Sequence, residues 1–268
     1  MKALLFRACR AAVLAVLAGI ERRFPRWNPD AAWRYLPIAR TIRKVIGPHG
    51  SVLDVGAGAE GIAPYLSNPM ILSDLAPPLA DPAAPFVQAS GTHLPFPDAS
   101  FDGVVSADSL EHVPGPLREE VIGEMFRVAR RIVVIAVPAG PAAEAHDRAL
   151  HEYSAPDSGF RIFLDEHIRH GLPSPEELVG TVHRAAAARF HAVQCRVYQN
   201  ASLGLRARMM RALMSPNARV AFIAYRFWTV VMPVLSRLGT RRGYRIVVAC
   251  WEGEPGGTGR LPVSAGPS

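Results

Sequence analysis

Short apolar runs bounded by polar residues recur along the first half of this chain and have the length of buried strands. They occupy residues 51–55, 70–73, 86–89, 101–106 and 131–137. Residues 28–47 and 114–131 instead show apolar positions at helical spacing. Buried strands that alternate with helices predict an α/β fold with a parallel sheet, which binds ligands at the carboxyl ends of its strands.

The segment SVLDVGAGAEGIAPYL, residues 51–66, predicts a strand, a glycine turn and, from residue 60 onward, the first turns of a helix. Gly56 and Gly58 let the backbone turn sharply and approach a ligand without a Cβ atom in the way. Asp54, near the end of the strand, can accept hydrogen bonds at the same edge. The spacing G-x-G-x-x-G also fits a dinucleotide-binding turn, and glycine turns occur without any ligand.

A second acidic residue, Asp74, follows the second predicted strand, twenty residues after Asp54. A carboxylate at this position is placed to accept hydrogen bonds from both hydroxyls of a ribose. A nicotinamide cofactor and an adenosyl cofactor fit this arrangement equally well. The alternative is that Asp74 only begins the proline-rich loop that follows it, because aspartate is common in turns.

The stretch SGTHLPFPDASFDGVVSADSLEHV, residues 90–113, decides between these cofactors. Together with LDVGAG, Asp74 and the following EMFRVAR helix, it resembles the class I S-adenosylmethionine-dependent methyltransferases that act on small-molecule and lipid acceptors. The resemblance covers about Val45 to Gly140, with several motifs in the right order and spacing. It implies a three-layer Rossmann-like fold with a mostly parallel seven-stranded sheet, an antiparallel edge hairpin formed by residues 190–199 and 244–251, and helical additions.

The resemblance also implies which residues bind S-adenosylmethionine. They are Asp54, Gly56, Ala57, Gly58, Asp74, Leu75, Ser90, Gly91 and Ser106. The first four would surround the methionine part of the cofactor. Asp74 would hold the ribose, Leu75 would pack on the adenine, and Ser106 would lie beside the sulfonium.

Two positions depart from the family pattern. Ala89-Ser90 replaces the usual Gly-Asp, so a neutral hydroxyl stands where a carboxylate would bind the adenine amino group. Glu60 replaces the third glycine of the usual triplet, and the glycine is displaced to Gly61. We therefore expect cofactor binding that is weakened but not absent.

Methyl transfer asks the protein mainly to align donor and acceptor and to exclude water. If the acceptor is a hydroxyl, a nearby base helps, and His112, His151 and Glu152 are the candidates. His112 directly follows the fourth strand, among other polar residues, although it could instead only pack against the next helix. His151 lies in the long connection after the fifth strand, where a purely structural role is the stronger alternative.

The spacing of His167 and His170 beside Glu166 resembles part of a metal site on a helix, but no third ligand is evident in the sequence. We interpret these residues as a surface face and predict no metal.

Positive charge is concentrated in two segments of a chain with a net charge of +7. Residues 1–29 carry six basic residues against one acid and predict a basic amphipathic helix, whose apolar run lacks a clean A-x-A cleavage site. Residues 200–243 carry eight arginines and no acid, interleaved with VAFIAY and FWTVVMPVL. We expect both segments to contact a membrane surface peripherally, because their apolar runs are too short to span a bilayer. Packing on the chain's own domain and homodimer formation are the alternatives, and the apolar interleaving disfavours nucleic acid.

The remaining composition places the chain in a reducing compartment. The three cysteines, Cys9, Cys195 and Cys250, lie far apart and match neither a metal-binding spacing nor a disulfide framework. Residues 30–252 are long enough for one methyltransferase domain with the insertion at 200–243, and residues 253–268 form a Gly/Pro/Ser-rich tail that we expect to be disordered.

These observations predict a cytoplasmic methyltransferase, peripheral to the inner membrane, that acts on a lipid, lipid-linked or glycan acceptor. One alternative is an NAD(P)-dependent oxidoreductase, although the chain has no Tyr-x-x-x-Lys pair. Another is a non-catalytic binding protein that retains the fold, which Ser90 and Glu60 leave open.

Overall fold

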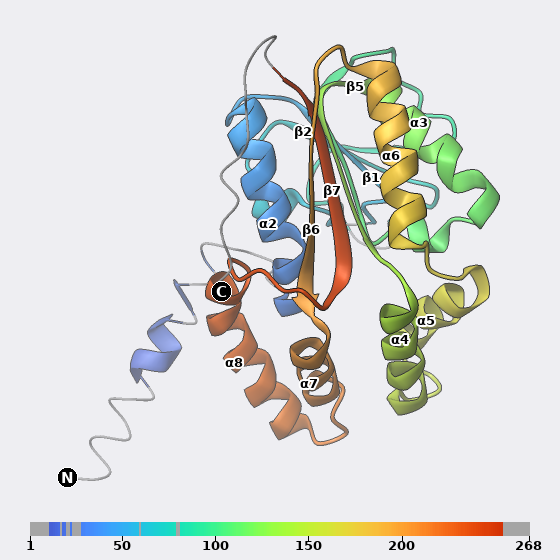
Figure 1. Ribbon diagram of the computed structural model, residues 1–268. Coiled ribbons are helices and arrows are strands. Elements are labelled where there is room, and N and C mark those ends of the chain that lie inside the picture. The colour runs from blue at the N-terminus through green and yellow to red at the C-terminus, as the bar shows by residue number, and fades with distance from the viewer. Residues whose placement is uncertain are drawn as a thin grey trace.

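The computed structural model describes residues 11–16, 18, 19, 22, 28–58, 60–78 and 81–253. These residues form one seven-stranded sheet with the strand order β3-β2-β1-β4-β5-β7-β6. The strands are β1 (Val52–Val55), β2 (Met70–Asp74), β3 (Phe86–Gln88), β4 (Phe101–Ala107), β5 (Ala129–Pro138), β6 (Val193–Ser202) and β7 (Gly243–Glu252). The first five are parallel, and β7 pairs antiparallel with both β5 and β6. The predicted mostly parallel sheet with an antiparallel edge hairpin is therefore confirmed (Figure 1).

Helices cover both faces of this sheet. Helix α2 (Pro29–Ile46) lies on one face, and α3 (Arg118–Val128) and α6 (Pro175–Arg189) lie on the other (Figure 1). Alternate residues of the central strand β5 point to opposite faces, as the pleat requires. Val134 packs into the core under α2, whereas Val133 packs into the core under α3 and α6.

Helix α2 confirms the helix that the sequence predicts before the first strand. Asn28 caps it, because the side-chain oxygen accepts hydrogen bonds from the backbone N–H groups of Asp30 and Ala31. The helix ends at Gly47, whose φ of 71° favours glycine. The cap places the first turn of α2 at the carboxyl edge of the sheet, where Asp30 and Arg34 line a cavity.

Four further helices lie together at this edge, in the lower part of Figure 1. They are α4 (Pro141–Tyr153), α5 (Gly159–His170), α7 (Leu203–Leu213) and α8 (Ala218–Leu235). The first two follow β5, and the last two make up most of the connection between β6 and β7. The carboxyl ends of the parallel strands are thus covered by helices from two distant parts of the sequence.

The helix expected from residue 60 onward is not formed. A turn and a short 3-10 helix, Ala63–Tyr65, take its place before β2. Gly61 has a φ of +50°, and an added Cβ there would lie 2.3 Å from Oδ2 of Asp54. This glycine therefore allows close contact with Asp54, and Pro64 follows within the short helix.

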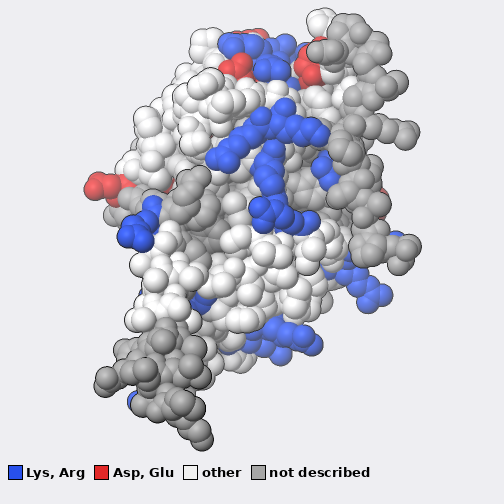
Figure 2. Space-filling view, turned by 90° about the vertical axis from the view of Figure 1, so that its left-hand side faces the viewer, with Lys and Arg blue, Asp and Glu red and all other residues white. Residues whose placement is uncertain are grey.

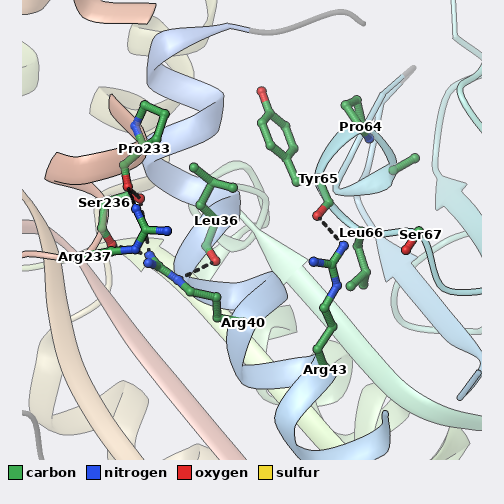
Figure 3. A pocket seen from close by; sticks show the side chains of 11 residues that line it. Leu36, Arg40, Arg43, Pro64, Tyr65, Leu66, Ser67, Pro233, Ser236 and Arg237 are labelled. Atoms are coloured by element: carbon green, nitrogen blue, oxygen red, sulfur yellow. Dashed lines mark hydrogen bonds between the residues drawn. The ribbon is translucent and has the colours of Figure 1, made fainter. Parts of the chain in front are cut away.

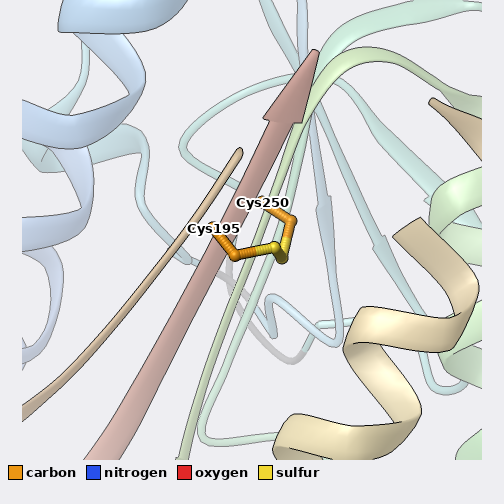
Figure 4. The surroundings of a disulfide bond; sticks show 2 residues. All are labelled: Cys195 and Cys250. Atoms are coloured by element: carbon orange, nitrogen blue, oxygen red, sulfur yellow. A yellow bond between two sulfur atoms is a disulfide. The ribbon is translucent and has the colours of Figure 1, made fainter. Parts of the chain in front are cut away.

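The prediction that the cysteines form no disulfide is wrong. Cys195 in β6 and Cys250 in β7 are joined by a disulfide bond, although 55 residues separate them (Figure 4). The two residues are direct partners in the antiparallel register of these strands, with Cα atoms 4.2 Å apart. Strand pairing, which the spacing of cysteines along the chain does not reveal, brings them together.

The connection between β6 and β7 contains the apolar runs VAFIAY and FWTVVMPVL. Helix α8 has 18 residues and is the one described helix that is long and apolar enough to cross a membrane by length and composition. The expectation that this segment is too short to span a bilayer is therefore wrong on length. Only 17% of this 18-residue span is buried, so most of its apolar surface faces outward.

Two predicted segments fall mainly outside the described residues. Of the basic helix expected at residues 1–29, positions 11–16, 18, 19 and 22 are helical, and Val13, Leu14 and Val16 are more than half exposed. The tail expected at 253–268 lies outside the described residues from 254 onward.

Candidate functional site

A cavity of about 530 Å³ lies at the carboxyl edge of the sheet. Helices α2, α5 and α7 and the segment after β4 form its walls. Its polar end is lined by Asp30, Arg34, Asp108, Glu111, His112 and His167. Its apolar wall consists of Phe160, Phe163 and Leu164 from α5, Met210 and Leu213 from α7, and Met214 just after α7. The cavity is therefore lined both by a charged cluster and by apolar side chains of two helices.

A buried ion network forms the floor of the polar end. Arg245, which is fully buried in β7, donates from Nε to both oxygens of Asp108 at 2.6 and 2.7 Å. Arg34 of α2 lies 3.0 Å from the same carboxylate. Asp108 has a φ of +52°, an uncommon conformation for a residue other than glycine. The network ties the end of β4 to β7 and α2.

Asp30 extends this network toward α7. Its carboxylate lies 3.2 Å from Arg245, 3.4 Å from Arg34 and 3.3 Å from Arg206. Burial alone would raise the pKa of Asp30, but these three arginines outweigh it and hold the pKa below its usual range. Asp30 is therefore ionised, and the charged floor joins two carboxylates to three arginines.

Two histidine–carboxylate pairs stand beside Glu111 at the polar end. His112, in the short 3-10 helix Leu110–His112, has Nδ1 at 2.6 Å from Oε2 of Glu166. His167 has Nδ1 at 2.8 Å from Oδ2 of buried Asp147. The Nε2 atoms of the two rings lie 3.4 Å apart, and Nε2 of His167 lies 3.8 Å from Oε1 of Glu111. Three atoms that can carry lone pairs, Nε2 of His112, Nε2 of His167 and Oε1 of Glu111, thus face one another.

Burial shapes the protonation of this cluster. Burial and the neighbouring His167 lower the pKa of His112, and Glu166 opposes that shift. Burial, followed by the charge of Asp108, raises the pKa of Glu111 well above its usual range. Glu111 is fully buried, and neither carboxylate oxygen has a hydrogen-bond partner among the described residues.

The two segments expected to hold an adenosyl cofactor are in contact. Oδ2 of Asp74, at the end of β2, accepts a hydrogen bond of 2.8 Å from the backbone N–H of Gly58. An added Cβ on Gly58 would meet no described atom within 4 Å, so the space in front of this turn is open. Leu75, next to Asp74, is 69% exposed. An exposed apolar side chain beside a carboxylate fits the adenine and ribose of S-adenosylmethionine.

Asp54 contacts the segment that follows the glycine turn. It is fully buried, and its Oδ2 accepts a hydrogen bond of 2.7 Å from the backbone N–H of Ile62. Its Oδ1 has no hydrogen-bond partner among the described residues, which leaves an acceptor for a polar group of a ligand. Burial raises the pKa of Asp54 to about 7, and the Ile62 hydrogen bond opposes that shift.

The other residues expected to bind the cofactor make contacts within the protein near the ends of the strands. Gly56 and Ala57 donate their backbone N–H groups to the carbonyl of Ser73, so they hold the turn against β2. Ser90 shares a hydrogen bond of 2.8 Å with Thr92, and an added Cβ on Gly91 would lie 3.2 Å from Val121. Ser106 is buried within β4, with 1% of its surface exposed. These residues shape the strand ends, and their contacts with a cofactor stay predictions.

The structure separates the two histidines proposed as bases. His112 lines the cavity, whereas His151 lies on α4 with Nε2 at 2.8 Å from Oδ1 of Asp165 and is not part of the cavity wall. His167, expected on a surface face, is buried and joins His112 and Glu111. The polar run after β4 signalled Asp108 and Glu111, but no local pattern pointed to Asp147, Arg206 or Arg245.

Comparison with known proteins places this geometry in a family. Residues 53–136 match the family model described as a methyltransferase domain. An uncharacterised methyltransferase of Mycobacterium tuberculosis is 31% identical over 160 residues, which are 57% of this chain and 59% of that protein. One from Mycobacterium marinum is 31% identical over 137 residues, half of each chain. The chain thus spans less than two thirds of the curated relatives that it matches.

A solved structure from Thermotoga maritima shares 16% identity with this chain. That protein is described as a SAM-dependent methyltransferase and possible histamine N-methyltransferase, and the match covers 83% of this chain and 91% of that one with a TM-score of 0.49. The matched family, the sheet order and the contact between the glycine turn and Asp74 lead to one assignment. Residues 53–136 of this chain therefore carry a methyltransferase domain, and the glycine turn and Asp74 that resemble the class I S-adenosylmethionine site meet within it.

Proposed function

We propose that this protein transfers the methyl group of S-adenosylmethionine to an amphipathic acceptor, a lipid or lipid-linked molecule, at an anionic membrane surface. The observation that carries this proposal is the cavity lined both by a charged cluster and by apolar side chains of α5 and α7. The family match favours methyl transfer over the nicotinamide-dependent alternative.

The shape of the cavity supports an amphipathic acceptor. Apolar side chains of α5 and α7, such as Leu164 and Met210, can pack along a hydrocarbon part. The ion network at the other end can hold a polar head group, because it offers both positive and negative charges. An acceptor with both parts would place its polar end beside His112 and Glu111.

The residues of the polar end supply alignment and proton transfer. When bound, S-adenosylmethionine supplies a methyl group on a positively charged sulfur. Asp74 and the turn at Gly58 would hold the ribose end, so that the donor reaches the cavity at the carboxyl edge of the sheet. Nε2 of His112 is placed to accept the proton of an acceptor hydroxyl, and Glu166 orients the ring through Nδ1.

Helix α8 supports contact with a membrane. Its outward apolar side chains, together with one just beyond its end, are Val220, Phe222, Ile223, Phe227, Val230, Val234 and Leu238, each more than 40% exposed. One side of α8 packs on α2 and α7, where Thr229 and Met232 are buried. Because crossing a bilayer would require α8 to leave these helices, we propose that it lies in the membrane surface.

Arginines gather next to α8 and supply positive charge. Figure 2 faces this side of the molecule and shows Lys and Arg side chains grouped above uncharged surface. Two adjoining pockets of about 280 and 470 Å³ share Arg40 and Arg237, and no described acidic residue lines either of them. Figure 3 shows Arg40, Arg43 and Arg237 held around the first pocket by backbone carbonyls of Leu36, Tyr65 and Pro233. Each basic residue near an anionic surface contributes about 1 kcal/mol.

The test of the reaction uses S-adenosylmethionine with a labelled methyl group. The purified full chain is incubated with the total lipid of a bacterial membrane and, separately, with the water-soluble metabolites. We expect label in the lipid fraction, and expect His112→Gln to lose most of it. Label only in the water-soluble fraction would reject the lipid acceptor, and no label in either would reject methyl transfer.

Membrane contact is tested by flotation with vesicles made of zwitterionic and anionic phospholipids. We expect the full chain to float with these vesicles, and the double variant Ile223→Asp, Phe227→Asp to stay in solution. The matched control is Leu117→Asp, because Leu117 is 43% exposed on the 3-10 helix Gly115–Leu117 beside α3. Equal flotation of all three proteins would show that α8 does not contact the membrane. A dimer that only the double variant disrupts would show that α8 packs against a second copy of the chain.

A further inference from the structure

We propose that Glu111, His112 and His167 bind one divalent transition-metal ion, such as Zn²⁺, at the polar end of the cavity. Each residue offers one donor atom, and the three atoms lie within 4.8 Å of one another. Imidazole nitrogen and carboxylate oxygen are common zinc ligands. The sequence pattern predicts no metal here, because two of the ligands precede α3 and the third lies more than fifty residues later on α5.

The distances between the donor atoms fit a shared ion. Zinc lies about 2.0–2.1 Å from imidazole nitrogens, so two such nitrogens in a tetrahedral site are about 3.3 Å apart. The Nε2 atoms of His112 and His167 are separated by 3.4 Å. Oε1 of Glu111 lies 3.8 Å from Nε2 of His167, which at similar bond lengths needs an angle of about 130° at the ion, wider than the tetrahedral angle.

Both histidines are oriented as metal ligands usually are. An imidazole that binds a metal through one nitrogen commonly donates its other N–H to a carboxylate, which fixes the ring. Nδ1 of His112 faces Glu166 at 2.6 Å, and Nδ1 of His167 faces Asp147 at 2.8 Å. Asp147 is itself fixed, because the hydroxyl of buried Tyr244 donates to its carboxylate at 2.8 Å.

This orientation leaves acceptor atoms that face one another. If each Nδ1–H donates to its carboxylate, both Nε2 atoms carry lone pairs across a gap of 3.4 Å. Beside them lies Glu111, fully buried, with both carboxylate oxygens lacking a hydrogen-bond partner among the described residues. Buried lone pairs without donors are costly, and a cation between them satisfies all three groups.

The cluster also has an open side. All three residues line the cavity of about 530 Å³, through which an ion can enter. Three protein ligands with a free position facing a cavity are typical of reactive zinc sites, whereas structural zinc sites are closed by four protein ligands. A bound ion would occupy Nε2 of His112, so the ion, and not that nitrogen, would then face the acceptor.

A second group of potential ligands does not compete in the oxidised protein. His183, Cys195 and Cys250 also bring three donor atoms together. The two sulfur atoms are joined in a disulfide and therefore offer no thiolate. Metal binding is accordingly measured on the full chain without a reducing agent.

The experiment measures metal binding directly, so its result does not depend on methyl transfer. The full chain is stripped with a chelator, dialysed and titrated with Zn²⁺ by calorimetry, with Co²⁺ as a spectroscopic probe. We expect one ion per chain and visible Co²⁺ absorption typical of nitrogen and oxygen ligands. The variants His112→Gln, His167→Gln and Glu111→Gln should each lose this signal while circular dichroism shows that they remain folded.

Two further variants separate a metal site from a network that only holds protons. In Asp147→Asn the amide can donate to Nδ1 of His167 and move the ring proton to Nε2, so affinity for Zn²⁺ should fall by about 10- to 100-fold. His170→Gln and His183→Gln are the matched controls, one on the same helix and one at the cysteine pair, and both should bind as the unmodified chain does. No binding by the unmodified chain, or loss of binding only in His183→Gln, would overturn the proposal.

Discussion

Arg245 in β7 forks onto the carboxylate of Asp108 at the end of β4, although 137 residues separate the two in sequence. The guanidinium is fully buried and also contacts Asp30 of α2 at 3.2 Å. Asp108 sits in the segment that leads to Glu111 and His112. One arginine on the antiparallel part of the sheet thus fixes the polar end of the cavity from below.

Replacement of Arg245 by methionine should strongly destabilise the protein. The change leaves Asp108 and Asp30 buried with one cation fewer, and loss of one partner of a buried pair typically costs about 3–5 kcal/mol. Urea unfolding followed by circular dichroism measures this loss. Adding Asp108→Asn to Arg245→Met should recover part of it, because the amide carries no charge, whereas a cost below about 1 kcal/mol for the single variant would contradict the role of the network.

Asp74→Asn should weaken binding of S-adenosylhomocysteine by about 10- to 100-fold. Hydrogen bonds to a charged group contribute about 1.5–3 kcal/mol, and the asparagine lacks that charge. Its side-chain oxygen can still accept from the N–H of Gly58, so the turn itself should persist. Calorimetry measures the affinity, with Asp98→Asn, which changes a 76% exposed carboxylate, as the control that should bind normally. Equal affinity in both variants would show that Asp74 does not touch the ribose.

Ser90→Asp should tighten cofactor binding, because it restores the charged acceptor that the family usually has at this position. The serine hydroxyl now shares its hydrogen bond with Thr92. We expect an increase of about 3- to 10-fold in affinity for S-adenosylhomocysteine, which is about one hydrogen bond improved from neutral to charged. Weaker binding would mean that position 90 does not face the adenine.

His146 should make stability depend on pH below neutrality. Burial and the neighbouring Arg206 lower the pKa of His146 from 6.5 to about 4. As pH falls below about 6.5, the unfolded chain binds a proton that the folded chain excludes, so stability present above that pH is lost progressively down to pH 4. The total is at most about 3 kcal/mol.

The variant His146→Gln isolates this contribution. Its side-chain oxygen can still accept from Arg206, which now lies 2.7 Å from Nε2 of His146. Urea unfolding at pH 7.5 and pH 5 should show a smaller loss of stability in the variant than in the unmodified chain. An identical loss in both would show that His146 does not remain neutral in the folded state.

Much of the fold follows from local sequence patterns. The short apolar runs predicted the parallel strands, because strands buried on both faces need few polar residues. Asn28 and Gly47 marked the two ends of α2. The glycine turn and Asp74 were placed correctly at one edge, since both end parallel neighbours in the sheet.

The polar end of the cavity could be predicted only in part. His112 and Glu111 follow a strand directly, but His167 and Asp147 come from helices whose packing the sequence does not reveal. The same limit explains the disulfide, because Cys195 and Cys250 meet only through the register of β6 and β7. The missing helix after β1 has a local cause, the positive φ of Gly61 above Asp54, which a count of helix-forming residues does not capture.

The most direct test of the central claim is calorimetric titration of the full chain with S-adenosylmethionine and with S-adenosylhomocysteine. We predict one binding site per chain for each compound, and we expect the two compounds to compete for it. The dissociation constants should be micromolar to submillimolar, which corresponds to binding free energies of about −5 to −8 kcal/mol. No binding of either compound at millimolar concentration would contradict the assignment of the glycine turn and Asp74 as a cofactor site.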